Sequence, residues 1–355
     1  MQTKVVKRME SFRVRNSKTD EQRKLLLPIS FGVSSVILLH ILDQHLDIQL
    51  SRTGRAGFSL CVVFIDSAFE STNNTTSFNK LHKLQSRYPR HSYNIWNINE
   101  TLEQKSLPLN AWSTGSVPHQ DGSHTGLRPE SYLSELLYSL PSAISRTDML
   151  GILRTRAIVK IAENLGCEGI LWGDTTTRLA EKILAETAKG RGFSLPWLVK
   201  DGDSCYGINF TYPMKDLLRK EVLSYAEIVF PPMHELFDHD ENKHVSVSAK
   251  NTTIDELMKD YFGSVEDNYP SIVANVVRTT GKLKALNAID SDRACTMCSM
   301  PVPEGSFGLA DWGGDQESSA LPESAFTNNK KPDDCCYGCA RSTRGTTAVQ
   351  SLSKD

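Results

Sequence analysis

The chain has 355 residues, of which 39% are hydrophobic, and its formal net charge is −2. This length allows one large domain or a main domain with a smaller module, and this apolar fraction can fill a sizeable core. The sequence holds no apolar run of the ~20 residues that a membrane-spanning helix needs, and no apolar signal core follows its first residues, so we expect a soluble intracellular protein.

Residues 1–24 form a basic segment, in which Lys and Arg clearly outnumber Asp and Glu. A basic arm of this kind suits a polyanion such as RNA, because phosphates attract clustered positive charge. The alternative is a solvated basic helix. The candidate RNA-binding residues are Arg8, Arg13 and Arg15 in this arm, and Arg154 and Arg156 on a later helix.

Residues 25–40 have the pattern of a strand, a turn of small residues and then a helix over about 33–47. The free backbone N–H groups at such a helix N-terminus, helped by the helix dipole, hold an anion where small residues let it approach. An ordinary capped turn is the alternative. The candidate nucleotide-binding residues in this first loop are Ser30, Gly32, Ser34 and Ser35.

The next segments alternate between strand and helix patterns. Residues 58–66 and 93–98 are apolar enough for strands, and 81–88 suits a short helix between them. This alternation predicts an α/β fold with a doubly wound parallel sheet. Residues 99–130 show little periodicity, and we expect a surface insertion there.

The helical pattern resumes after the insertion. We expect helices over 132–140, 148–165, 175–189 and 215–226, strands over 169–174 and 206–210, and polar helices beyond residue 232. The scattered histidines have no metal-ligand spacing, and solvated loops explain them best.

A second loop repeats the pattern of the first, with Gly173, Asp174 and three threonines between a strand and a helix. Both loops should lie at the carboxyl edge of one parallel sheet, which is where open α/β folds bind ligands. Gly173 and Asp174 therefore join the candidate nucleotide-binding residues. The alternative is that Thr175 to Thr177 only cap the helix.

The C-terminal tail, from residue 290 onward, is rich in cysteine. Two C-x-x-C units offer the four thiolates that a structural zinc site needs, although they are further apart than in common zinc ribbons. An iron–sulfur cluster and unliganded cysteines are the alternatives. Cys335 is a spare thiol that could replace Cys336. The candidate metal ligands are Cys295, Cys298, Cys336 and Cys339.

The first loop resembles the PP-loop of N-type ATP pyrophosphatases, S-G-G-x-D-S, which here reads S-F-G-V-S-S over 30–35. Phe31 replaces a glycine and Ser34 replaces the aspartate. The second loop resembles the G-H-x-x-D-D signature, but Arg178 stands in place of one carboxylate and the other is also absent. These losses remove magnesium partners, and the bulk of Phe31 should obstruct phosphate, so we expect weak or absent ATP binding.

The active tRNA thiolation enzymes of this superfamily carry a catalytic C-x-x-C unit at a position that corresponds to about 147–150, where this chain has no cysteine. A second catalytic cysteine has no counterpart either. A degenerate PP-loop, in which signature residues are replaced, occurs here together with C-terminal C-x-x-C pairs. This combination resembles the cytoplasmic tRNA 2-thiolation protein 2 family over most of the chain. Family members usually begin with a further cysteine-rich segment, so we expect that this start is truncated.

The resemblance implies a cytoplasmic, non-catalytic subunit with no catalytic residue of its own. It would form a heterodimer with the catalytic thiolation subunit and contact tRNA. The complex would place sulfur at C2 of the wobble uridine in tRNAs for Lys, Glu and Gln, with sulfur supplied as the thiocarboxylate of a ubiquitin-related modifier; a role in protein conjugation stays open. The alternatives are an active ATP-dependent sulfurtransferase, or a zinc-dependent scaffold without tRNA contact.

The expected organisation has three parts: a basic arm over 1–24, a PP-loop-like α/β domain over 25–289, and a small cysteine-rich zinc module over 290–355.

Overall fold

The centre of the structure is a six-stranded sheet with the strand order β3-β2-β1-β4-β6-β5. The computed structural model describes residues 1–12, 23–66, 74–98, 137–229, 236–237, 252–284, 294–302 and 335–343. The parallel strands are β1 (Arg23–Ile29), β2 (Phe58–Asp66), β3 (Ser92–Asn97), β4 (Gly169–Leu171) and β6 (Asn209–Thr211). The short β5 (Gly202–Asp203) pairs antiparallel with β6 at one edge. This topology confirms the predicted parallel α/β sheet.

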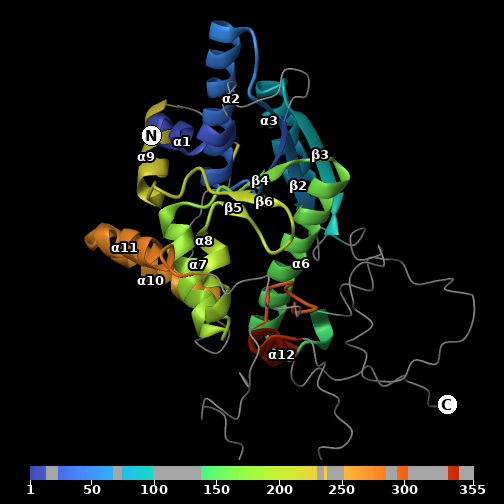
Figure 1. Ribbon diagram of the computed structural model, residues 1–355, viewed down its shortest axis with the longest axis vertical. Coiled ribbons are helices and arrows are strands. Elements are labelled where there is room, and N and C mark those ends of the chain that lie inside the picture. The colour runs from blue at the N-terminus through green and yellow to red at the C-terminus, as the bar shows by residue number, and fades with distance from the viewer. Residues whose placement is uncertain are drawn as a thin grey trace, which may run out of the picture.

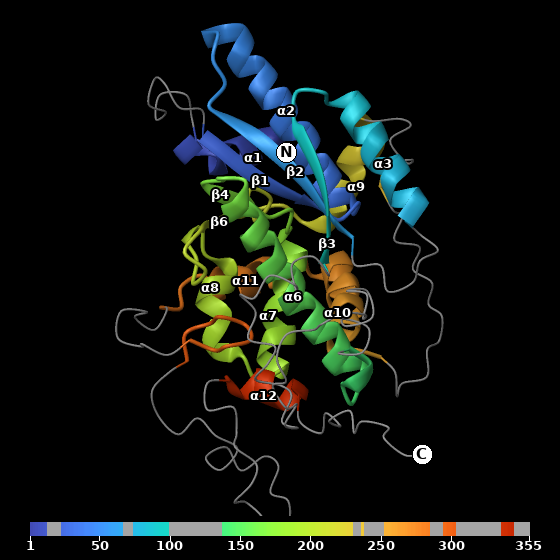
Figure 2. The same ribbon diagram turned by 90° about the vertical axis from the view of Figure 1, so that its right-hand side faces the viewer.

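Helices cover both faces of the sheet (Figures 1 and 2). One face carries α1 (Gln2–Arg8), α2 (Val33–Thr53), α3 (Asn74–Arg87) and α9 (Arg219–Val229). The other face carries α6 (Ala143–Asn164), α7 (Thr176–Ala188), α8 (Leu195–Val199), α10 (Ile254–Asn268) and α11 (Pro270–Thr280). Because successive side chains of a strand point to opposite faces, Leu25 and Leu27 enter the first core and Leu26 enters the second.

Most of the predicted elements are present, but several of their ends differ from the prediction, and the helix predicted over 132–140 lies largely outside the described residues. Helix α2 continues to Thr53 and ends at Gly54, which adopts the left-handed backbone conformation with φ 69°. Helix α6 begins several residues earlier than predicted, because the Ser142 side chain accepts a hydrogen bond from the backbone N–H of Ser145. Helix α9 begins at Arg219. The predicted insertion over 99–130 lies outside the described residues.

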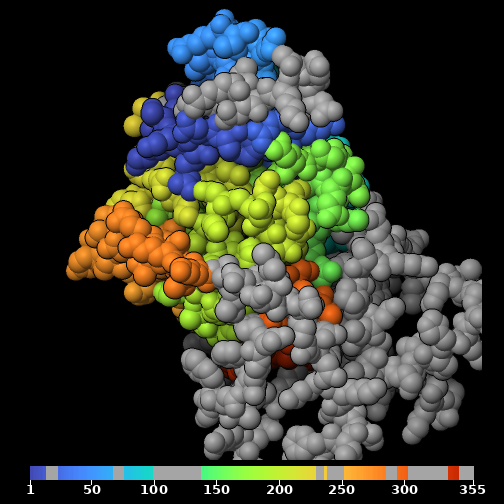
Figure 3. Space-filling model, in the orientation of Figure 1, coloured from blue at the N-terminus to red at the C-terminus, as the bar shows by residue number. Residues whose placement is uncertain are grey.

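Residues 1–12 pack against the domain. Helix α1 and the 3₁₀ turn η1 (Glu10–Phe12) bury Val5, Met9 and Phe12, and the Phe12 ring meets the edge of Phe58 at 6.3 Å between centroids. In the space-filling view the dark-blue N-terminal residues belong to the continuous surface of the upper part of the molecule (Figure 3). This half of the basic segment is therefore a packed element, and residues 13–22 lie outside the described part.

Residues 294–302 and 337–343 lie at the end of α6 and α7 that is distant from the sheet (Figure 2). Residues 294–302 and helix α12 (Tyr337–Thr343) form a third hydrophobic cluster with Met149 and Leu153 of α6. Among the described residues, no helix is both long and apolar enough to cross a membrane.

Candidate functional site

The hydroxyl groups of the first loop bond within the loop. Ser35 Oγ donates to the carbonyl of Gly32 at 2.9 Å, and Ser30 Oγ accepts from the Gly32 N–H at 3.4 Å. Ser30 Oγ and Ser35 Oγ lie 3.5 Å apart. Gly32 is the N-cap of α2 and provides no side-chain cap, while Ser34 is half-buried on the first turn. The loop therefore has the predicted strand–turn–helix form, with two of its hydroxyls already engaged.

Phe31 is anchored in the hydrophobic core under this loop. Its side chain is 2% exposed and its ring lies 4.9 Å from that of Phe64. Its backbone φ is 55°, in the left-handed region that glycine adopts without strain. We expected the bulk of this side chain to fill the place of a phosphate; the ring instead points into the core, so its effect on the loop acts through the backbone.

The second loop touches the first, as predicted. A Cβ atom on Gly173 would lie 3.2 Å from the Cα of Ser35, so only glycine fits without a shift. Thr175 caps α7 by accepting from the Arg178 N–H at 3.2 Å. The hydroxyl of Thr176 donates to the Lys215 carbonyl at 2.6 Å, and that of Thr177 accepts from the Arg219 N–H at 3.0 Å. Thr175 therefore caps the helix as the alternative proposed, whereas Thr176 and Thr177 bind backbone groups just before and at the start of α9.

The charged side chains of the second loop are paired with neighbours on α7. The Asp174 carboxylate lies 2.6 Å from Lys182 Nζ, and Arg178 lies 2.7 Å from Glu181. Burial lowers the pKa of Arg178, but the charge and hydrogen bond of Glu181 outweigh burial and raise it overall. Asp174 is therefore a partner for a lysine at the position where the resemblance suggests a nucleotide.

The four predicted metal ligands come together in a buried cluster. The Sγ atoms of Cys295, Cys298, Cys336 and Cys339 all lie within 4.8 Å of one another, and each residue is buried. The Cys298 and Cys336 Sγ atoms are 3.8 Å apart. Cys335 is half-buried and its Sγ lies 3.3 Å from Thr296 Oγ1, so the quartet contains Cys336 and not the spare thiol. Four converging thiols could hold one metal ion.

Two glycines let the second C-x-x-C unit sit directly on the turn after α7. A Cβ on Gly190, where φ is 79°, would lie 2.5 Å from the Tyr337 ring. A Cβ on Gly338 would lie 2.7 Å from the Lys189 carbonyl oxygen. This close approach fixes α12 against the main domain.

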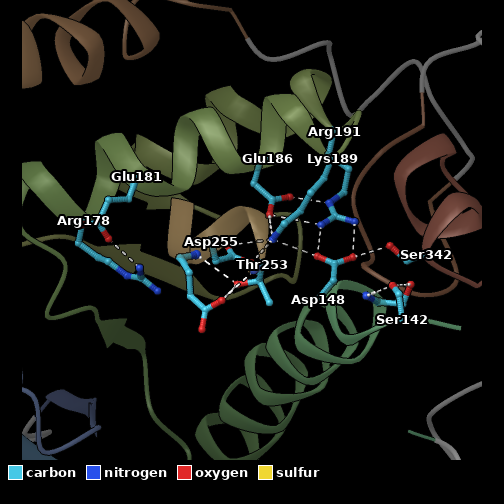
Figure 4. Close-up of polar contacts among 12 residues, drawn as sticks. Ser142, Asp148, Arg178, Glu181, Glu186, Lys189, Arg191, Thr253, Asp255 and Ser342 are labelled. Atoms are coloured by element: carbon cyan, nitrogen blue, oxygen red, sulfur yellow. Dashed lines mark hydrogen bonds and ion pairs between the residues drawn. The ribbon is translucent and has the colours of Figure 1, made fainter. Parts of the chain in front are cut away.

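A buried network of charges lies between α6, the end of α7 and α12 (Figure 4). Arg191 donates to both carboxylate oxygens of Asp148, and Ser342 Oγ donates to Asp148 Oδ2 at 2.8 Å. Lys189 Nζ lies 3.3 Å from Asp148 and 2.7 Å from Asp255. Burial raises the pKa of Asp148, but the hydrogen bonds and charge of Arg191 outweigh it, so the pKa lies below its usual value.

This network extends to the four-cysteine cluster, because Arg191 Nη1 lies 4.0 Å from Cys339 Sγ. Asp148 lies in the stretch over 147–150 where the resemblance suggests a catalytic C-x-x-C unit. Here its carboxylate accepts hydrogen bonds from Arg191 and Ser342. Sequence reasoning missed Asp148 and Arg191 as site residues, since neither has a motif around it and their pairing exists only in three dimensions.

The candidate RNA-binding arginines have different surroundings. Arg8 lies 2.8 Å from Asp216, also pairs with Asp201, and donates to the Tyr212 carbonyl. Arg156 donates to backbone carbonyls beside the cysteine cluster. Arg154 is exposed on α6. Arg13 and Arg15 fall outside the described residues, as do His234, His239 and His244.

Comparisons with known proteins give the same family for several parts of the chain. Residues 253–341 match the family model described as cytoplasmic tRNA 2-thiolation protein 2. A protein of that description from Phaeosphaeria nodorum is 47% identical over 97% of this chain and 88% of its own length. The corresponding protein from Pyrenophora tritici-repentis is 45% identical over 98% of this chain and 88% of its own length.

A solved structure resembles the fold. It is the U34-tRNA thiolase NcsA from Methanococcus maripaludis with its [4Fe-4S] cluster, and it is 15% identical with a TM-score of 0.51. The match covers 84% of this chain and 83% of that one. At this identity the likeness shows the fold alone.

Proposed function

Because the chain belongs to the cytoplasmic tRNA 2-thiolation protein 2 family, we propose that it is a non-catalytic subunit that serves tRNA 2-thiolation in the cytoplasm. The observation that carries the non-catalytic role is the state of the two loops at the sheet edge. Their architecture is that of a PP-loop protein, but the hydroxyls of Thr175 to Thr177 and the charge of Asp174 are engaged with the protein itself. Neither loop contains a thiol that could attack sulfur or substrate.

The finer reading follows from the resemblance. The partner is a catalytic PP-loop thiolation subunit, with which this chain forms a heterodimer. That subunit adenylates O2 of the wobble uridine in tRNAs for Lys, Glu and Gln, and sulfur from the thiocarboxylated ubiquitin-related modifier then displaces AMP. This chain supplies fold stability and tRNA surface. The proposed tRNA contacts are Arg13 and Arg15 of the basic arm and Arg154, which is exposed on α6. Arg8 and Arg156 donate to protein carbonyls.

We propose that the four-cysteine cluster holds one structural zinc ion. Zn–S bonds of about 2.3 Å in a tetrahedron place the sulfurs about 3.8 Å apart, and Cys298 and Cys336 have this separation. In a [4Fe–4S] cluster each thiolate binds a different iron, so the four sulfurs would have to be spread further apart than this compact quartet. A closed four-thiolate site has no open position for substrate, which suits a structural role.

Metal analysis of the purified chain tests the zinc proposal. We expect one zinc per chain, lost in Cys298→Ser and retained in the matched variant Cys335→Ser, because Cys335 lies outside the quartet. Iron with acid-labile sulfide would reject zinc in favour of a cluster. Loss of metal in the Cys335 variant would show that the ligand set is different.

A thiolation assay tests the non-catalytic role. The chain is purified alone and with its catalytic partner, and ATP-dependent 2-thiolation of wobble uridine is measured. We expect activity only from the pair. The variant Asp174→Asn in the pair should retain activity, because the Asp174 carboxylate is held by Lys182. Thiolation by the chain alone would instead support an active sulfurtransferase. Full activity of the partner without this chain would remove its role in the reaction.

A further inference from the structure

Arg156 binds the loop between the first two cysteines of the metal centre. Its Nη1 atom donates to the Thr296 carbonyl at 2.6 Å and to the Met297 carbonyl at 2.7 Å. These are the two residues between Cys295 and Cys298. Arg156 projects from α6, so one side chain of the main domain holds both peptide groups of this turn.

The remaining carbonyls of the same C-x-x-C unit are also engaged. Tyr206 Oη donates to the Cys298 carbonyl at 2.9 Å, and the Cys295 carbonyl accepts from the Ser299 N–H at 2.8 Å. Ser299 itself has a φ of 58°, which is uncommon for a residue with a side chain. The turn is therefore fixed by partners outside itself, and Arg156 supplies two of its hydrogen bonds.

The charge of Arg156 is not paired with a carboxylate from the part of the chain that the structure describes. No Asp or Glu oxygen of these described residues forms an ion pair with its guanidinium, although the side chain is half-buried. The guanidinium instead lies beside the four-cysteine cluster, because both carbonyls that it binds belong to the turn between Cys295 and Cys298. A half-buried cation at this place favours negative charge in its surroundings.

A divalent ion held by four thiolates leaves the centre with net negative charge. We propose that Arg156 is the positioning residue of the metal centre, fixing the first C-x-x-C turn through its carbonyls and balancing the negative charge of the loaded thiolates. This inference rests on the proposed metal centre. It gives Arg156 a role different from the RNA contact that the sequence suggested. Groups that bind the residues around metal ligands generally orient those ligands and change the metal affinity of the site, and Arg156 would act in this way.

The test is the metal affinity of the full-length chain, measured by competition with a chromophoric zinc chelator, and the absorption spectrum of the cobalt-substituted protein. We expect Arg156→Gln to weaken zinc binding by about 10- to 100-fold and to alter the thiolate-to-cobalt charge-transfer bands. Arg156→Lys keeps the charge, but its shorter side chain should not bring the ammonium fully to the place from which Nη1 donates to both carbonyls, so its affinity should be intermediate.

Lys160→Gln is the matched control, because it removes a positive charge one turn further along α6, where Lys160 forms a surface pair with Glu163. Its zinc affinity should equal that of the original chain. Unchanged affinity in Arg156→Gln, or an equal loss in Lys160→Gln, would overturn the inference. If Arg156→Gln does not fold, Arg156→Lys decides, and unchanged affinity there overturns it. An original chain that binds no metal would reject the metal centre itself, a different result from unchanged affinity in the variants.

Discussion

Asp148 and Arg191 lie 43 residues apart in the sequence and form a buried two-point ion pair beside Cys339. The pair joins α6 to the turn after α7, and Ser342 of α12 bonds to the same carboxylate. The main domain and the cysteine-rich segments therefore share one polar network, which makes the α12 position dependent on a residue of α6.

Asp148→Asn should destabilise the protein. The change leaves the buried Arg191 guanidinium with Glu186 as its remaining carboxylate partner, and breaking a buried pair in this way costs about 3 kcal/mol of unfolding free energy. Urea unfolding measures the loss. Asp255→Asn is the control, because Asp255 is 30% exposed where it pairs with Lys189, and its loss should stay below about 1 kcal/mol. Equal losses in the two variants would contradict the central role of Asp148.

Gly190→Ala should displace α12. The added Cβ would meet the Tyr337 ring, and alanine would have to adopt a left-handed φ. We therefore expect a loss of about 1–3 kcal/mol of unfolding free energy together with weaker metal retention. Gly192→Ala, two residues away, meets no atom within 4 Å and is the control. In a double-mutant cycle Tyr337→Ala should recover part of the Gly190→Ala loss, since it removes the clash. Purely additive losses would show that this contact does not decide the α12 position.

Phe31→Gly should lower stability by about 3 kcal/mol. The loss of a buried ring outweighs the relief of a left-handed backbone, which is worth about 1 kcal/mol. Phe31→Leu keeps an apolar side chain in place and should lose less. Calorimetry of the original chain should show weak or absent ATP binding, because the loops lack the signature carboxylates that would hold magnesium. Since the Phe31 ring lies in the core, Phe31→Gly can strengthen binding only by relaxing the left-handed backbone of the loop. Micromolar ATP affinity of the original chain would contradict the prediction.

His40 should make stability fall in mild acid. Burial and then the charge of Arg87 lower the pKa of His40 from 6.5 to about 4. The unfolded chain therefore binds the proton more readily, so stability is complete above pH 6.5 and decreases as the pH falls towards 4. Unfolding free energies at pH 7 and pH 5 measure this. His40→Gln should reduce the pH dependence without abolishing it, because burial also lowers the pKa of His91. An unchanged slope in the variant would assign the effect elsewhere.

Much of the fold could be predicted from local patterns. The apolar run over 58–66 and the small residues after Ile29 are sufficient to indicate a buried parallel strand and a strand–turn–helix unit, and both are present. The ends of α6 and α9 were less predictable, because a cap such as Ser142 has a weaker pattern than a hydrophobic face. The antiparallel β5 was missed, since two residues give no periodicity.

The cysteine quartet could also be predicted, because metal-binding thiols can be recognised in a sequence by residue type and C-x-x-C spacing. What surrounds it could not. Arg156 appeared as a free basic residue suited to RNA, and its carbonyl partners lie about 140 positions further along the chain.

The sequence by itself determined the parallel α/β sheet, the family and the four thiols, since each depends on residue types that recur at short, regular spacing. The tertiary structure alone decided which charges are paired and which hydroxyls are engaged. The pairing of these charges and hydroxyls depends on side chains from α6, α12 and the turn after α7 that meet in a buried space. An unsatisfied polar group or an unpaired charge is costly there.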